Sequence, residues 1–246
     1  MSVLDRPQSN HHGGTATGAQ RVLLACGVAY GPIYIVTNDV VAANFYQGYS
    51  RMDQAISELS ATSAPTRSFL VAMLPVGTAL LIAFGIGVWI TANANRALRV
   101  IGGLMIALGI TGVAWLPFPM SSREDMTKVA MPANDLGHLV LSAVTVLLIL
   151  AIIGFGAVAI RNLVFRLYSA VTVMAVGFGT VVGMQAPNIP EGLPTQWMGL
   201  FERVNVYGYM LWVAVFAVIL LRSVSAARTE HSSGENPRGS SGSRLL

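Results

Sequence analysis

Six long apolar stretches alternate with polar segments along the chain. They run approximately from Arg21 to Ala43, Ser68 to Ile90, Leu98 to Pro117, Leu136 to Ile160, Val164 to Ala186 and Val204 to Leu221. A helix that crosses a bilayer needs about 20 mostly apolar residues. Unpaired backbone groups cost several kcal/mol each in hydrocarbon, and the stretches lack the alternating pattern of barrel strands. The pattern therefore predicts an all-α, polytopic membrane helix bundle of six transmembrane helices.

The two ends of the chain differ from this central part. Residues 1–20 contain no apolar run, and residues 223–246 are rich in Ser, Gly and Arg. Neither segment can bury a core, so both are expected to be disordered tails that flank a transmembrane domain over residues 21–222. The first segment also lacks the apolar core of a cleavable signal peptide, and none is expected.

The positively charged residues predict the orientation of the bundle. Ten of the 15 Lys and Arg residues fall in the two tails and in the second and fourth connections, whereas most acidic residues fall on the other side. Lys and Arg accumulate on the cytoplasmic side of membrane proteins. Both termini are therefore expected in the cytoplasm, and the long first, third and fifth loops are expected outside.

Composition agrees with a membrane protein and argues against other classes. Hydrophobic residues make up 54% of the chain, charged residues make up 11%, and mean hydropathy is +0.62. The net charge of +4 comes mainly from residues at the ends of apolar stretches, which indicates topology and argues against nucleic-acid binding. Cys26 is the only cysteine, and His138 is the only histidine in the membrane portion. Neither a metal site nor a cofactor is therefore expected.

The first outer loop predicts a short amphipathic helix. Ser50 and Asp53 resemble a helix capping box, and Met52, Ile56 and Leu59 fall on one helical stripe. Such a helix is expected to lie on the outer membrane surface or over the mouth of the bundle. The fifth loop predicts a similar short turn before the sixth helix.

Ionisable residues near the outer ends of the helices form a candidate ligand-binding site. An ionised carboxylate within hydrocarbon costs roughly 2.5–3.5 kcal/mol, so Asp39 must lie near the interface, be paired or be protonated. A histidine at the same side can exchange a proton near neutral pH. The hypothesis gathers Asp39, Ser57, Glu58, His138, Glu202 and Arg203 into one pocket. The alternative is that these groups are ordinary charges at helix ends that neutralise one another.

Three functions are compatible with this pattern, and it does not identify catalytic residues. The first is an outward-facing vestibule that binds or handles a lipid or amphiphile, with Arg203 on an anionic head group. The second is a non-enzymatic structural or partner-binding membrane subunit. The third is a lipid-directed hydrolase that uses His138 and a carboxylate. In this hypothesis Ser57, Glu58 and His138 form a triad with Ser57 as the nucleophile. Glycine pairs at GxxxG spacing favour helix packing within one chain and leave homo-oligomerisation open.

Four parts of the chain resemble one family. They are GPIYIVTND in the first helix, GYSRMDQAISELSATSAP in the first loop, His138 at the start of the fourth helix, and GLFERVNVYGYMLW leading into the sixth. Over approximately Val22 to Arg222 the chain is similar to the bacterial and archaeal membrane proteins catalogued as domain of unknown function 998. The resemblance implies six helices in a bacterial plasma (inner) membrane and no established activity. The chain departs from the family pattern at Thr62-Ser63, where a typical member has a Gly.

Overall fold

The computed structural model describes residues 13–128 and 133–234, and all regular secondary structure in these residues is helical. Six helical segments are long and apolar enough to cross a membrane, which confirms the six-span prediction. They are α1 (Gly13–Ile35), which continues through η1 (Val36–Ala42) and α2 (Ala43–Phe45), then α3 (Arg67–Thr91), α4 (Arg96–Ala114), α6 (Ala133–Ala159), α7 (Leu163–Gly183) and α8 (Met198–Gly234). The short elements between them are η2 (Ile56–Ser60), α5 (Arg123–Met126) and η3 (Ala186–Asn188). The chain is thus a multi-pass membrane helix bundle.

Two helices are longer than the apolar pattern predicts. α1 begins at Gly13, inside the predicted N-terminal tail, and α8 continues to Gly234, well past Leu221. Hydropathy marks only the part of a helix that lies in hydrocarbon, and no Pro or Gly interrupts the polar sequence SVSAARTEHSS that continues α8. The remainder of both predicted tails, residues 1–12 and 235–246, lies outside the described residues, as do residues 129–132.

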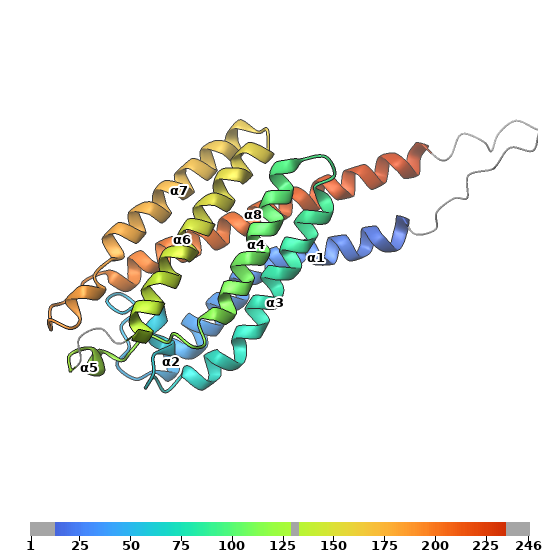
Figure 1. The fold of residues 1–246 in the computed structure, drawn as a ribbon. Coiled ribbons are helices and arrows are strands. Elements are labelled where there is room, and N and C mark those ends of the chain that lie inside the picture. Colours follow the sequence, from blue (N-terminus) through green and yellow to red (C-terminus); the bar gives the residue numbers. More distant parts are fainter. Residues whose placement is uncertain (1–12, 129–132, 235–246) are drawn as a thin grey trace, which may run out of the picture.

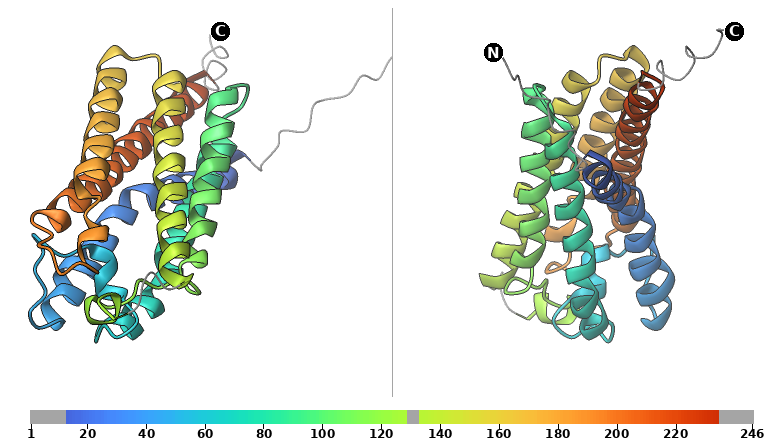
Figure 2. Two further views of the ribbon diagram at one scale, coloured as in Figure 1. Left: turned by 60° about the vertical axis from the view of Figure 1, so that its left-hand side comes forward. Right: turned by 90° about the vertical axis from the view of Figure 1, so that its right-hand side faces the viewer.

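The long helices form a ring in which chain neighbours lie side by side. α7, α6, α4 and α3 form a row, and α1 and α8 cross behind it and close the ring (Figure 1). The first and last described residues and the short connections after α3 and α6 lie at one end of the bundle (Figure 2). The three longer loops gather at the opposite end, which we call the capped end and define as residues 46–66, 115–128 and 184–197.

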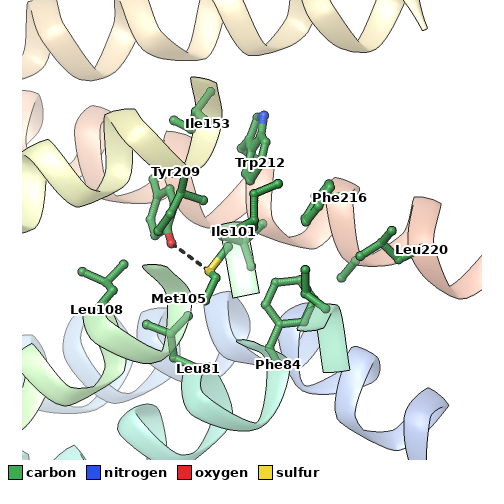
Figure 3. Packing of buried hydrophobic residues seen from close by; sticks show 14 of the residues in the cluster. Leu81, Phe84, Ile101, Met105, Leu108, Ile153, Tyr209, Trp212, Phe216 and Leu220 are labelled. Atoms are coloured by element: carbon green, nitrogen blue, oxygen red, sulfur yellow. Dashed lines mark hydrogen bonds between the residues drawn. The ribbon is translucent and has the colours of Figure 1, made fainter. Parts of the chain in front are cut away.

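Aliphatic and aromatic side chains pack together in the centre of the bundle (Figure 3). Phe84 of α3, Phe165 of α7 and Trp212 and Phe216 of α8 contact one another, with the rings of Trp212 and Phe216 stacked at 5.0 Å. The indole N–H of Trp212 donates to the hydroxyl of Ser169 at 2.9 Å. Phe84, Trp212 and Phe216 are fully buried, so these side chains form part of a closed core within the bundle.

Glycines create the closest helix contacts. A Cβ atom on Gly102 of α4 would lie 2.8 Å from the carbonyl oxygen of Gly85 in α3. A Cβ atom on Gly179 of α7 would lie 2.8 Å from the carbonyl oxygen of Phe201 in α8. Backbones touch at these positions, as small residues allow in membrane helices, and the contacts lie within one chain as the sequence predicts.

Candidate functional site

A widened helical turn presents Asp39 to α8. Pro32 lacks a backbone N–H, and shortly after it the helix changes to π geometry over Val36–Ala42. The side chains of Thr37 and Asn38 donate to carbonyl oxygens one turn earlier, at 2.7 and 3.0 Å. These side-chain bonds compete with the regular backbone ladder and satisfy carbonyls in the distorted region. Asp39, the one carboxylate of the first membrane-spanning segment, thus lies in the irregular turn.

Asp39 and Arg203 of α8 form a buried, bidentate ion pair. Arg203 Nη2 lies 2.7 Å from Asp39 Oδ1 and Nε lies 3.0 Å from Oδ2, and the two side chains are only 9% and 14% exposed. The other donors of the guanidinium go to the carbonyl oxygens of Arg51 and Gly199 and to the hydroxyl of Tyr49, at 2.8, 3.0 and 3.0 Å. All five N–H groups of Arg203 therefore have partners within the chain.

Further groups complete the surroundings of Asp39. The hydroxyl of Tyr207, one turn after Arg203, donates to the Asp39 carboxylate, and Arg51 Nη2 donates to the Asp39 carbonyl oxygen at 2.7 Å. Burial raises the pKa of Tyr49, so its phenol keeps the proton that it donates to the carbonyl of Ala55 at 2.8 Å. Of the three states that the sequence allows for Asp39, the structure shows the paired one.

A second ion pair joins the loops of the capped end to one another. Arg123 Nε of α5 lies 2.6 Å from Glu58 Oε2, and Nη2 lies 2.8 Å from Oε1. These hydrogen bonds to Glu58 raise the pKa of Arg123, and partial burial opposes the shift. Arg123 also donates to Thr195 Oγ1 of the third capped-end segment at 3.0 Å, and that hydroxyl donates to the Asp53 carbonyl at 2.8 Å. All three segments of the capped end therefore meet at Arg123.

Glu202 binds backbone where the first loop approaches α8. Its Oε2 accepts a hydrogen bond from the N–H of Ile56 at 2.6 Å. The N–H of Leu200, two residues earlier in α8, donates to the carbonyl of Met52 at 3.0 Å. The start of α8 therefore holds the first loop through both a side chain and the backbone.

The short helix of the first loop begins later than the sequence predicts. Ser50 Oγ accepts from the N–H of Asp53 at 3.2 Å, as one half of a capping box would, but only a turn follows. Helical geometry starts at Ile56, where Glu58 accepts from the N–H of Ala55 at 2.9 Å. Tertiary contacts hold this turn, because the carbonyls of residues 51 and 52 accept hydrogen bonds from Arg203 and Leu200 of α8.

His138 and Ser57 contact other partners. His138 Nδ1 lies 3.1 Å from the carbonyl oxygen of Phe118, and its ring meets that of Trp115 edge-on at 4.6 Å between centroids. Ser57 Oγ donates to Met120 Sδ at 3.3 Å. Within the described residues, neither side chain bonds to a member of the two ion pairs or to Glu202. The structure therefore brings Asp39, Arg203, Glu202, Glu58 and the backbone of Ser57 together, whereas the His138 side chain has other partners. The side chains of Ser57, Glu58 and His138, within the described residues, do not bond to one another as a triad would.

Sequence reasoning did not select Arg51, Arg123 or Tyr207. Tyr207 carried a usable signal, because it follows Arg203 by four residues and so falls on the same face of α8. Arg123 lies in a polar loop beside two acidic residues, and nothing local indicates that its partner is Glu58, 65 positions away. Such a pairing depends on how the loops fold over one another.

A small polar cleft opens beside the second ion pair. Its volume is about 160 Å³. It is lined by Tyr46, Gln54, Glu58, Ala61, Ser63, Ser122, Arg123 and Glu124. Pockets for drug-sized ligands are roughly 300–1,000 Å³ and mostly apolar. The cleft therefore fits one polar side chain or a small polar molecule better than it fits a lipid.

A family model described as protein of unknown function (DUF998) matches residues 14–219. The matched range reaches all six long helices and includes the three loop segments of the capped end. The comparisons with curated proteins and with solved structures gave no match.

Proposed function

The chain belongs to the DUF998 family, and we propose that this member is a non-enzymatic, partner-binding membrane subunit whose capped end is the recognition surface. The observation that carries the proposal is the complete use of Arg203 within the chain. A guanidinium with no spare N–H group cannot bind a head group without giving up an existing bond. Its role is to hold the first loop to α8.

The remaining charged contacts support the same role. Glu58 and Arg123 bind each other, and Glu202 binds the backbone of Ile56. Holding loops in one conformation before binding lowers the entropy that a complex must lose. A preformed surface with a small polar cleft suits the insertion of one polar side chain of a protein partner.

Binding of a lipid or amphiphile at the capped end is supported less well. It needs a free cationic group and an apolar recess, whereas Arg203 is occupied and the cleft is small and polar. We further propose, from the distribution of Lys and Arg, that the capped end faces the outside of a bacterial inner membrane.

Photo-crosslinking from the cleft distinguishes these functions. A photoreactive phenylalanine analogue in place of Ser63 is expected to give a discrete protein adduct in native membranes, because Ser63 lines the cleft and is exposed. The same probe in place of Phe178, which is 60% exposed on α7, serves as the control and should label lipid. Adducts would be identified by mass spectrometry.

The companion variant combines Glu58→Gln with the photoreactive residue in place of Ser63. It removes the charge that holds Arg123 and should reduce the protein adduct. Labelling of lipid alone from both probe positions would contradict partner binding and favour the amphiphile alternative.

A further inference from the structure

An open crevice lies at the end of the bundle opposite the capped end. Its volume is about 690 Å³, and it lies between the α3–α4 connection and the α6–α7 connection. It is lined by Asn95, Arg96, Ala97, Val158, Ala159, Ile160 and Arg161. The lining contains two cationic side chains and no carboxylate. The crevice is therefore electropositive, and its size is that of a ligand pocket.

The two arginines of this crevice have free donors. Arg96 and Arg161 are exposed, and within the described part of the chain neither makes a hydrogen bond or an ion pair. Arg203 and Arg123 at the capped end, in contrast, both bind carboxylates. Arg96 is also the first residue of α4, so the partial positive charge of the first helical turn adds to the positive potential of the Arg96 side chain.

The backbone around the crevice is fixed by asparagines. Asn95 Oδ1 accepts from the N–H of Leu98 at 3.2 Å and caps α4, and Asn162 Oδ1 accepts from the N–H of Phe165 at 3.0 Å and caps α7. Asn95 Nδ2 also lies 3.5 Å from the carbonyl oxygen of Ala159, which links the two connections. The two arginines therefore extend from backbone segments that are held close together.

The position of the crevice indicates which anion it would meet. α4 begins at Arg96 and α6 ends at Ala159, so the crevice lies where two membrane-spanning helices leave the hydrocarbon. Val158, which is 68% exposed, and Ile160 supply an apolar edge beside the arginines. Basic pockets between transmembrane helices bind anionic lipid head groups, and arginine matches phosphate through paired hydrogen bonds.

We propose that this crevice binds the phosphate of an anionic phospholipid, with Arg96 and Arg161 on the phosphate and Val158 and Ile160 against the upper part of the acyl chains. The apolar edge is the reason for assigning a lipid and not free phosphate, which would leave Val158 and Ile160 uncovered. This site is separate from the capped end and does not depend on the function proposed for it.

Lipid binding by the full chain tests the proposal. The apparent dissociation constant for phosphatidylglycerol would be measured in neutral detergent micelles by native mass spectrometry, with phosphatidylcholine as the zwitterionic comparison. The double variant Arg96→Gln/Arg161→Gln is expected to weaken phosphatidylglycerol binding roughly 10- to 30-fold at low salt. The control Arg222→Gln removes an exposed arginine at the same end that does not line the crevice, and should change binding less than about twofold.

A second variant and a competitor complete the test. Val158→Asp places a carboxylate beside both arginines on an exposed position, and should weaken phosphatidylglycerol binding even if the double variant folds poorly. Inorganic phosphate at the same concentration as the lipid should not compete. The proposal would be overturned by equal losses in Arg222→Gln, by equal binding of phosphatidylcholine, by unchanged affinity in the crevice variants, or by effective competition from inorganic phosphate.

Discussion

Replacing Arg203 by Gln is expected to lower the free energy of unfolding by about 3–5 kcal/mol, because the Asp39 carboxylate would remain buried without its cation. The Asp39 side chain is only 14% exposed, so water can replace the lost bonds only in part. The same substitution removes bonds to the carbonyls of Arg51 and Gly199 and so loosens the first loop. Unfolding of the purified protein in mixed micelles, titrated with a denaturing detergent, measures the change.

The matched control is the exposed ion pair at Lys128. Its Nζ lies 3.9 Å from Asp125 Oδ1, and the side chains are 66% and 52% exposed. Exposed pairs contribute little, so Lys128→Gln should change the free energy of unfolding by about 0.5 kcal/mol or less. Similar effects of Arg203→Gln and Lys128→Gln would mean that the Asp39–Arg203 pair does not hold the capped end.

Gly199→Val is expected to cost about 3 kcal/mol in the free energy of unfolding, the upper end for overpacking. A Cβ atom at this position would lie 2.6 Å from the carbonyl oxygen of Arg51 and 3.0 Å from Arg203 Nη1. The first of these neighbours is backbone, so relief requires the first loop to move away from α8. The same detergent titration measures the loss, and faster amide hydrogen exchange over residues 51–56 would report the loosened loop.

Gly208 provides the control for Gly199, since both lie in α8. Apart from its chain neighbours and the adjoining backbone of α8, no atom lies within 4 Å of a Cβ atom built on Gly208. Gly208→Val should therefore stay within about 0.5 kcal/mol of the unmodified protein. Equal tolerance of valine at both positions would show that the first loop is not closely packed against the start of α8.

The six spans could be predicted from the sequence because hydrocarbon imposes a length and forces backbone bonding into helices. Helix ends were less predictable, since α8 continues through SVSAARTEHSS, where the polar residues carry no hydropathy signal but still form helix. The first loop shows a different limit. Its stripe of Met52, Ile56 and Leu59 indicates a helix, yet helical geometry starts only at Ile56, and the preceding turn bonds to α8 through the carbonyls of residues 51 and 52.

The candidate site was predictable only in part. The cost of an ionised carboxylate in hydrocarbon left Asp39 near the interface, paired or protonated, and the structure pairs it with Arg203, which the sequence had placed at the same depth. His138 lies in α6 on that side of the bundle, and its ring contacts the Phe118 carbonyl and not the ion pairs. Depth along a helix follows from sequence, whereas the direction in which a side chain points depends on how the helices pack.

A double-mutant cycle on Asp39 and Arg203 tests most directly whether the charged residues of the capped end act by holding loops to helices. The cycle compares Asp39→Asn, Arg203→Gln and the double variant by detergent unfolding, and isolates the energy of the pair from the effect of either side chain alone. The structure predicts a coupling energy of about 2–3 kcal/mol, near the top of the range for directly contacting residues. A coupling energy close to zero would contradict the account.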